Sequence, residues 1–348
     1  MKRIGNLVEA TASMPNILCA IAEAEKRCNR RGSYYQQIVE FNENIEDNIK
    51  RIQEIIMTGK WDFWGYKSFT RYEHGKLRQI DWNPCFRDSV IQHAIYQTAG
   101  KVLERSCILD TYSGFKRRGM SFGAERMRLF IDEIIREVGA AVLIYVWKAD
   151  IKGFYQHIMI ELLFDMIMRK IKDTIILALI WTMLSSHPNG LPIGNFLSQL
   201  FANFYLNGVD HWAKEVFKMK YYSRYCDDST SLSIEKNRLK QFSDEYEDRI
   251  APLGLVLKPN VQIFPITRNG IDFMGYVFHP DKTCLRKRIE RSFRRRVHLF
   301  DRHPDLPHYQ SVASYYGWCK GLTRGMALWN SVTHDRSIKQ LHKEAKTV

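Results

Sequence analysis

Runs of apolar residues predict strands and helices that alternate through the central part of the chain. Short continuous or β-branched apolar runs are typical of strands. The predicted strands cover 142–147, 220–225, 229–234 and 271–278. Apolar residues at intervals of three and four predict amphipathic helices. These helices cover 41–57, 158–171, 196–217 and 239–250. Such a mixture favours an α+β fold.

Shifts in pattern and charge divide the chain into three regions. Residues 1–140 combine helical stretches with a hairpin signal at His74-Gly75, and residues 141–280 hold most of the predicted strands. Residues 281–348 carry 15 Lys or Arg against 6 acidic residues, so a net charge of +9 out of the total +14 lies there. We therefore expect the strongest positive field at the C-terminal end.

The composition favours a folded protein with a polyanionic partner. With 348 residues, of which 45% are hydrophobic, the chain is long enough to bury a sizeable core. A formal charge of +14 favours nucleic acid over a membrane, because the longest apolar stretch, 175–184, is too short to span a bilayer. The N-terminus lacks the apolar core of a signal peptide, which predicts a cytoplasmic protein.

The seven cysteines are scattered through the chain, and no two of them have Cys-x-x-Cys spacing. One would be left over if they paired. This pattern predicts reduced thiols rather than a disulfide framework or a structural zinc site.

Two acidic elements carry the candidate chemistry. Tyr225-Cys226-Asp227-Asp228 places adjacent carboxylates between two predicted strands, and Asp150 follows the buried strand 142–147. Adjacent carboxylates repel, and hard divalent cations such as Mg²⁺ relieve that repulsion. Each element alone also fits a simpler explanation, a solvated turn for the pair and a strand-end or helix-capping aspartate for Asp150. Together they predict a site for two metal ions, as nucleotidyl transfer requires.

A glycine-containing loop and a helix lie between the two acidic elements. Residues 190–195 have the composition of a loop, and Asn195 is able to cap the helix that follows. Gly194 and Ser198 are small residues four positions apart, so a base and sugar could approach the backbone closely. A tightly packed helix start is the alternative interpretation.

These elements together resemble the catalytic motifs of reverse transcriptases. Asp150 with Phe154-Tyr155 resembles their first motif, 192–198 their Pro-x-Gly-x-x-x-Ser element, and 225–228 their Tyr-x-Asp-Asp motif, in the same order and at similar spacing. Three further segments extend the resemblance over most of the chain. They are 254–259 after the catalytic turn, 271–276 as a primer-gripping hairpin, and 87–94 as a fingers element of bacterial reverse transcriptases.

The resemblance implies a right-hand polymerase, which is an α+β fold with fingers, a palm built on an antiparallel catalytic sheet, and a helical thumb. The fingers and N-terminal region would cover 1–140, with part of 156–190 contributing to them. The palm would cover 141–280, and the basic helical thumb 281–348.

The resemblance also assigns the metal site. Asp150, Asp227 and Asp228 would be catalytic, and together with Ile151 they would bind two Mg²⁺ ions, with Mn²⁺ as the other candidate. One ion would activate the 3′-hydroxyl of the primer, and the other would neutralise the departing pyrophosphate.

Six residues are assigned to the incoming dNTP by the same resemblance. They are Lys76, Arg78, Tyr155, Ile193, Gly194 and Gln199. Tyr155 lies five positions after Asp150, where these enzymes place an aromatic gate against the ribose 2′-hydroxyl; a core tyrosine is the alternative. Lys76 and Arg78 are two apart and would face the same side of a strand, which suits a triphosphate, although a solvated hairpin would also explain them.

The second motif departs from most reverse transcriptases in a way that resembles one class. Those enzymes have Gln before the glycine and Ser-Pro after it, whereas this chain has Ile193-Gly194 and Ser198-Gln199. The pattern is similar to that of diversity-generating retroelements. Membership would imply a bacterial, archaeal or phage gene, a template-repeat RNA copied into cDNA with errors opposite adenine, and an accessory variability protein as partner. A branched alkyl group at 193 offers shape but no polar contact, which predicts weaker selection of the nascent pair.

A dense basic segment follows the predicted palm. It includes seven cations: Arg286, Lys287, Arg288, Arg291, Arg294, Arg295 and Arg296. A thumb helix along the template and primer duplex would explain this segment, and the resemblance adds Gly275 and Tyr276 as further template/primer contacts. A binding face for structured RNA or for an acidic protein would also explain it. The downstream aromatic residues at 315, 316, 318 and 329 are expected to pack the thumb.

Two other functions are compatible with parts of this pattern. A group II intron-like or retron reverse transcriptase would share the carboxylates but not Ile193 and Gln199. A catalytically idle RNA-binding protein would keep the fold, but three clustered acids would then face a polyanion without a purpose.

Overall fold

The computed structural model describes residues 3–26, 32–73 and 75–346. Contacts along the chain group it into two units, each assembled from separate stretches. The first unit comprises Met1–Gly114, Ile151–Lys218 and Glu245–Lys258, and the second comprises Phe115–Asp150, Met219–Asp244 and Pro259–Val348. The expected three-part division into 1–140, 141–280 and 281–348 stays a prediction.

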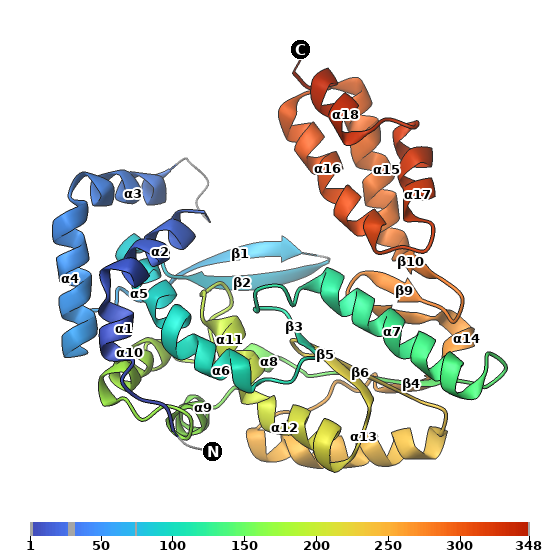
Figure 1. The fold of residues 1–348 in the computed structure, drawn as a ribbon, viewed down its shortest axis with the longest axis horizontal. Coiled ribbons are helices and arrows are strands. Elements are labelled where there is room, and N and C mark those ends of the chain that lie inside the picture. The colour runs from blue at the N-terminus through green and yellow to red at the C-terminus, as the bar shows by residue number, and fades with distance from the viewer. Residues whose placement is uncertain (1–2, 27–31, 74, 347–348) are drawn as a thin grey trace. The chain divides into compact units, whose positions relative to one another are not determined.

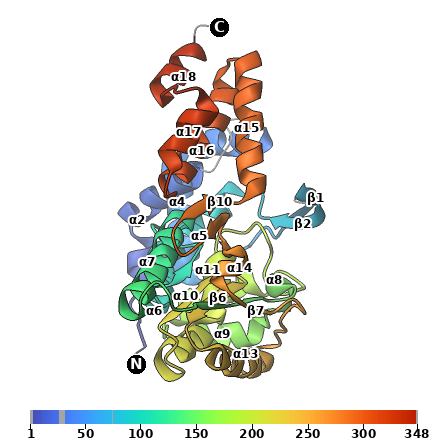
Figure 2. The same ribbon diagram turned by 90° about the vertical axis from the view of Figure 1, so that its right-hand side faces the viewer.

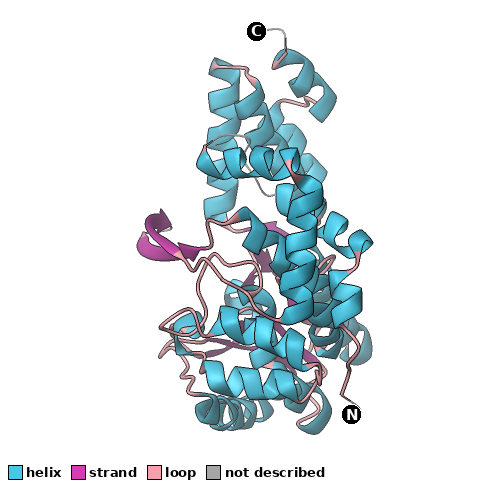
Figure 3. Cartoon of the chain, turned by 90° about the vertical axis from the view of Figure 1, so that its left-hand side faces the viewer, coloured by secondary structure: helices cyan, strands magenta, loops and turns pink. Residues whose placement is uncertain are grey.

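The first unit is mostly helical and carries one hairpin, drawn in magenta at the edge of the helices in Figure 3. Its helices are α1 (Val8–Ala12), α2 (Met14–Glu25), α3 (Ser33–Glu43), α4 (Ile45–Thr58), α5 (Phe86–Ile95), the π-helix η1 (Tyr96–Gly100), α6 (Lys101–Ser106), α8 (Phe154–His157), α9 (Ile160–Met168), α10 (Thr174–Leu184), α11 (Ser198–Tyr205), α12 (Asn207–His211), the π-helix η2 (Trp212–Val216) and the 3₁₀ turn η3 (Ala251–Leu253). Its strands are β1 (Lys67–Glu73), β2 (Lys76–Trp82) and β3 (Thr111–Tyr112). The hairpin predicted from the sequence is confirmed, although His74 at its tip lies outside the described residues.

Two of the predicted helices are interrupted. The helix expected over 41–57 is broken at Asn44, whose φ of −121° and ψ of 40° separate α3 from α4. The amide of Asn48 donates to the carbonyl of Phe41 across this corner at 3.0 Å. The helix expected over 196–217 changes direction at Leu206, where α11 ends and α12 begins. Asparagine side chains compete with helical hydrogen bonds, which explains the first break, whereas apolar periodicity continues through it.

The second unit is built on antiparallel strands covered by helices (Figure 1). Four strands lie side by side in the order β5 (Tyr221–Tyr225), β6 (Asp228–Ser233), β4 (Tyr145–Asp150) and β7 (Gln262–Pro265). A three-stranded sheet contains β8 (Ile271–Phe273), β9 (Tyr276–Phe278) and β10 (Thr283–Leu285). The helices are α7 (Met120–Val138), α13 (Lys236–Ile250, which continues into the first unit), α14 (Ile266–Asn269), α15 (Lys287–Arg302), α16 (Leu306–Lys320), α17 (Gly325–Thr333) and α18 (Ile338–Glu344).

The strand predictions are confirmed, except that one predicted strand is divided into two. The runs at 220–225 and 229–234 are β5 and β6, and the run at 142–147 begins three residues later as β4 and ends at Asp150. The run at 271–278 is a hairpin of β8 and β9, turning at Met274-Gly275, where both residues have positive φ. Aromatic rings pack α13 against these strands, as Phe242 of α13 contacts Trp147 of β4 and Tyr222 of β5 edge-on at 5.0 and 5.9 Å.

The C-terminal helices α15 to α18 pack around their own apolar core (Figure 2). Phe293, Val297 and Phe300 recur on one face of α15 at helical spacing and are at most 2% exposed. Trp329 of α17 stacks on Phe293 at 5.6 Å, and its indole is buried. The expectation that aromatic residues pack these helices is therefore confirmed for Tyr315, Tyr316 and Trp329. Trp318 lies against Tyr276 of β9, at a ring distance of 5.2 Å.

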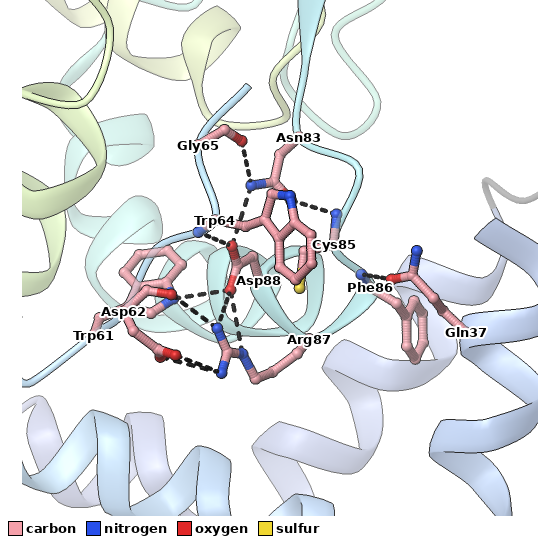
Figure 4. A network of polar contacts seen from close by, with 10 residues as sticks. All are labelled: Gln37, Trp61, Asp62, Trp64, Gly65, Asn83, Cys85, Phe86, Arg87 and Asp88. Carbon is pink, nitrogen blue, oxygen red and sulfur yellow. Dashed lines mark hydrogen bonds and ion pairs between the residues drawn. The ribbon is translucent and has the colours of Figure 1, made fainter. Parts of the chain in front are cut away.

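A buried aspartate fixes the base of the hairpin in the first unit (Figure 4). Asp88 of α5 is fully buried and accepts hydrogen bonds from the indole of Trp61 at 3.0 Å, the backbone of Trp64 at 2.8 Å and the amide of Asn83 at 3.2 Å. Arg87 supplies its counter-charge at 3.1 Å. Asp88 thereby joins the segment before β1, the segment after β2 and α5. A buried carboxylate with this many donors is stable only as a complete network.

None of the described helices combines the length and the apolarity that a membrane crossing needs.

Replacing Asp88 is expected to destabilise the protein strongly. Asp88→Ala leaves the buried donors of Trp61 and Trp64 without this acceptor and removes the buried one of the two carboxylates beside Arg87. Breaking such a network costs about 3–5 kcal/mol of unfolding free energy. Asp62→Ala removes the exposed partner of the same arginine and should cost far less. Urea unfolding followed by circular dichroism measures both, and equal losses for the two variants would contradict this account of Asp88.

Candidate functional site

The predicted carboxylates lie at one end of the strands β5, β6 and β4 of the second unit. The antiparallel register of β4 and β6 places Asp150 directly opposite Asp228, and Tyr225 of β5 is also a register partner of Asp228. Cys226 stands in the turn between β5 and β6 with a φ of 54°. A non-glycine residue in the left-handed region is strained, and such strain persists where the surrounding structure fixes it.

A buried arginine supports this turn from below. Arg224 is fully buried, and its guanidinium donates to the carbonyl of Cys226 at 2.7 Å. The strand register also places Arg224 opposite Ser229. The turn that presents Asp227 and Asp228 therefore has its backbone held by a charged donor from the sheet interior.

The Asp228 carboxyl is partly buried among charges of both signs. Burial raises the pKa of Asp228 to about 6, an effect that Asp150 and Asp227 reinforce and that the Lys148 ammonium opposes. The Nζ atom of Lys148 lies 3.3 Å from Oδ2 of Asp228. The site thus combines the facing acids Asp150 and Asp228, and the neighbouring Asp227, with one resident cation.

The donor set fits a hard divalent cation. Oδ1 of Asp228 is buried and accepts no hydrogen bond from the described residues, and an oxygen in this condition is available to a metal. Among residues 3–26, 32–73 and 75–346, no three or more His, Cys, Asp or Glu side chains gather closely enough to hold an ion. Mg²⁺ is often bound by one or two carboxylates, with water and substrate phosphates completing its octahedron, and the facing pair Asp150 and Asp228 suits that mode.

A pocket of about 880 Å³ opens beside these carboxylates within the second unit. Its lining is mostly polar and includes Lys148, Asp150, Asp228, Gln262, Arg268 and Asp272. It also includes Val261. The acids therefore border a cavity that holds charges of both signs, and such a cavity can bind a charged ligand.

The residues predicted to contact a dNTP all belong to the first unit. The side chain of Lys76 lies outside the described part of the structure. The loop at 190–194 is held between two of their elements by backbone hydrogen bonds. The amide of Leu191 donates to the carbonyl of Tyr155 at 2.8 Å, and the amide of Asp81 in β2 donates to the carbonyl of Ile193 at 2.8 Å. The structure therefore brings Tyr155, Ile193 and the base of the hairpin together.

Close approach explains both glycines of this loop. Gly190 has a φ of +56°, and a Cβ there would lie 2.2 Å from the carbonyl oxygen of Tyr155. Gly194 has a φ of +118°, and a Cβ there would lie 2.8 Å from Ile80 of β2. The small residue at 194 thus accommodates the hairpin of the protein itself. A dNTP contact at Gly194 stays a prediction.

Asn195 does not cap the following helix. Leu197 occupies the N-cap position of α11, which has no side-chain cap, and the amide of Asn195 instead lies 3.4 Å from the sulfur of Met183. The expected cap is therefore wrong, because two further residues precede the first turn. Gln199 is exposed on α11. Its Cβ lies close to Gly114, since a Cβ added to that glycine would be 3.0 Å away from it.

The remaining predicted site residues differ in exposure. Arg78 is exposed on β2, and Tyr155 is half-buried beside Phe154 at a ring distance of 5.6 Å. Ile151 is 1% exposed and forms a β-bridge with Leu257. Its side chain has no oxygen, so it could offer a metal only its backbone carbonyl. Their roles toward metal and dNTP stay predictions.

The predicted template/primer residues all lie in the second unit. Tyr276 is 1% exposed, and its hydroxyl donates to the carbonyl of Trp318 at 3.3 Å, so its ring packs inside the unit. Gly275 faces the same tryptophan, since a Cβ there would lie 2.7 Å from the indole. Primer contact by this turn would therefore come from its backbone. Arg286 is half-buried and bonds Asp272 at 2.7 Å. The other cations are exposed on α15: Lys287, Arg288, Arg291, Arg294, Arg295 and Arg296.

The sequence interpretation missed two residues that touch the acidic site. Lys148 is two positions before Asp150 on one strand, so alternation alone would have placed both side chains on the same face. Arg224 precedes the aromatic residue of the acidic motif, but no pattern in the chain indicates that its side chain is buried under the turn.

Comparisons with known proteins support the fold. No protein-family model matches the chain, and no curated protein matches it. Among solved structures, apo telomerase from Candida tropicalis covers 82% of this chain and 55% of its own, with a TM-score of 0.53 and 12% identity. Telomerase from Candida albicans, in complex with the TWJ fragment of telomeric RNA, covers 81% of this chain and 63% of its own, with a TM-score of 0.50 and 11% identity.

The chain thus aligns with less than two thirds of each telomerase. Its mixture of helices and antiparallel sheets is similar in fold to these telomerase structures.

A methyl group at Gly275 is expected to disrupt the packing of the turn against α16. Gly275→Ala adds a Cβ at 2.7 Å from Trp318 in a backbone conformation with a φ of +86°, so the melting temperature should fall by several degrees. Gly317→Ala is the matched control on α16, because its Cβ would meet nothing within 4 Å and alanine favours helix. Differential scanning calorimetry compares them, and a Gly275 variant as stable as wild type would refute the packing role.

Proposed function

We propose that the chain is an RNA-directed DNA polymerase, which extends a DNA primer on an RNA template by two-metal nucleotidyl transfer. The observation that carries the proposal is the register of Asp150 opposite Asp228, beside a strained turn, on an antiparallel sheet within a reverse-transcriptase-like fold. In the proposed hand, the fingers cover 1–140 with part of 156–190, the palm 141–280 and the thumb 281–348.

The carboxylates would hold two Mg²⁺ ions, with Mn²⁺ as the other candidate. Asp150, Asp227 and Asp228 would supply the side-chain oxygens, and Ile151 its carbonyl. Bound ions would make the primer 3′-hydroxyl a better nucleophile and stabilise the charge of the departing pyrophosphate. The buried Oδ1 of Asp228 supports this assignment, because none of the described residues donates a hydrogen bond to it.

Residues of the first unit would bind and orient the dNTP. Lys76 and Arg78 would contact the triphosphate, and the half-buried Tyr155 would exclude a ribose 2′-hydroxyl. Ile193 lines a pocket of about 260 Å³ together with Gln156 and His187, which supports a role beside the nascent base pair. Gly194 and Gln199 would complete this surface.

The proposed polyanionic partners are a template RNA and the cDNA that grows on it. The exposed cations of α15 would contact the phosphates of the duplex, since α15 buries its apolar face and presents its arginines outward. The solved complex of Candida albicans telomerase with a telomeric RNA fragment supports RNA as a ligand of this fold.

We further propose membership of the diversity-generating retroelement class. The departures Ile193 and Ser198-Gln199 support it, and so does the position of Ile193 on a pocket wall. The enzyme would then copy a template-repeat RNA with errors opposite adenine, aided by an accessory variability protein.

Loss of one acid is expected to abolish the proposed activity. Asp227→Ala should reduce primer extension on an RNA template with Mg²⁺ by about 1000-fold, because metal-assisted charge stabilisation contributes several kcal/mol. Asp244→Ala, on the exposed face of α13, is the control and should extend like wild type. An Asp227 variant that extends normally would refute the function. Salt-sensitive RNA binding without incorporation by wild type would indicate an idle binding protein instead.

The residue at 193 is expected to set fidelity. Ile193→Gln adds a polar contact beside the incoming nucleotide, so misincorporation opposite template adenine should fall by roughly tenfold, whereas Ile193→Leu should keep the wild-type spectrum. Sequencing the cDNA made by the purified protein on its flanking RNA measures both. An unchanged spectrum in the glutamine variant removes Ile193 as a fidelity determinant.

A further inference from the structure

Lys148 is a cation built into the acidic site. It lies two residues before Asp150 on β4, and its register partner on β6 is Thr230. Asp228 is therefore the diagonal neighbour of Lys148 across the strands, within reach of a long side chain. The ammonium lies 3.3 Å from Oδ2 of Asp228 and occupies the same pocket wall as Asp150.

Two further contacts hold the Lys148 side chain in this place. Its ammonium donates to the backbone carbonyl of Asp272 on β8 and lies 6.0 Å from the centre of the Phe273 ring. Only 24% of the Lys148 side chain is exposed. Asp272 is itself bound to Arg286 through its carboxylate, at 2.7 Å from Nε. The lysine is therefore anchored between the catalytic strand and β8, unlike a mobile surface lysine.

The anchored ammonium and a divalent cation compete for the same carboxylate. Oδ2 of Asp228 contacts Lys148, whereas Oδ1 accepts no hydrogen bond from the described residues. A cation on Asp228 would face a positive charge a few ångströms away, and like charges at this range repel strongly in a partly buried site.

We propose that Lys148 is a positioning residue that serves as the resident counter-ion of Asp228. It keeps the three acids compatible with the fold when no metal is bound, and it lowers the affinity of the site for a single divalent cation. Because of this lower affinity, divalent cations would enter the site more readily together with a substrate whose phosphates add negative charge. This inference rests on the proposed metal-dependent function and adds a residue to it.

The test is binding of Mn²⁺ alone to the full chain, measured by electron paramagnetic resonance of the free ion. Lys148→Met should bind Mn²⁺ about tenfold more tightly than wild type, because the competing charge is gone. Lys148→Arg keeps the charge and should stay within about twofold of wild type. Lys236→Met removes an exposed cation near the far end of the same sheet and controls for net charge.

A second readout is the melting temperature without metal. Lys148→Met should melt below wild type and regain the difference in saturating Mn²⁺, because the ion replaces the lost counter-charge. Adding Asp228→Asn to Lys148→Met should abolish the tighter binding.

The possible outcomes separate a failure of the counter-ion role from a failure of the two-metal function. Unchanged or weaker Mn²⁺ binding by Lys148→Met overturns the counter-ion role but leaves the metal site. Tighter binding that persists in the double variant also overturns it, since the ion would then bind elsewhere. If neither wild type nor Lys148→Met binds Mn²⁺, the proposed two-metal function fails and the counter-ion role fails with it.

Discussion

Electrostatic repulsion among three carboxylates is the constraint on which the second unit depends. Asp150 faces Asp228 across paired strands, and Asp227 precedes it in the same turn. The fold tolerates this arrangement because cations are placed around it. Arg224 holds the turn backbone from the buried side, and Lys148 contacts Asp228 from the pocket side. A site that already balances its charges in this way can exchange a resident cation for metal ions with little rearrangement.

Backbone contacts fix the elements of the first unit that sequence motifs single out. The loop at 190–194 bonds to Tyr155 on one side and to Asp81 on the other, and both glycines make room for neighbouring main chain or side chain. The buried Asp88 network fixes the hairpin base to α5. Elements held by such contacts are rigid, and the proposed positioning of a nucleotide would require that rigidity.

Local patterns predicted most elements and the position of the acids. Apolar runs located β5, β6 and the strand that ends at Asp150, because burial sets those patterns directly. The break at Asn44 comes from local asparagine hydrogen bonds, which apolar periodicity does not record. The late start of α11 and the burial of Tyr276 depend on tertiary contacts, which periodicity does not contain. Lys148 could have been placed beside the acids from strand alternation, whereas its bond to Asp272 depends on how β8 packs.

The proposed function requires Asp150 and Asp228 to share divalent cations. Crystals grown with a template and primer duplex, dNTP and Mn²⁺, with diffraction recorded at the manganese absorption edge, test it most directly. If the carboxylates share metal ions, anomalous peaks are expected within coordination distance of the Asp150 and Asp228 oxygens, with the Lys148 ammonium displaced from Oδ2 of Asp228. Peaks bound only elsewhere on the protein, or none at this sheet end with the duplex in place, would contradict it.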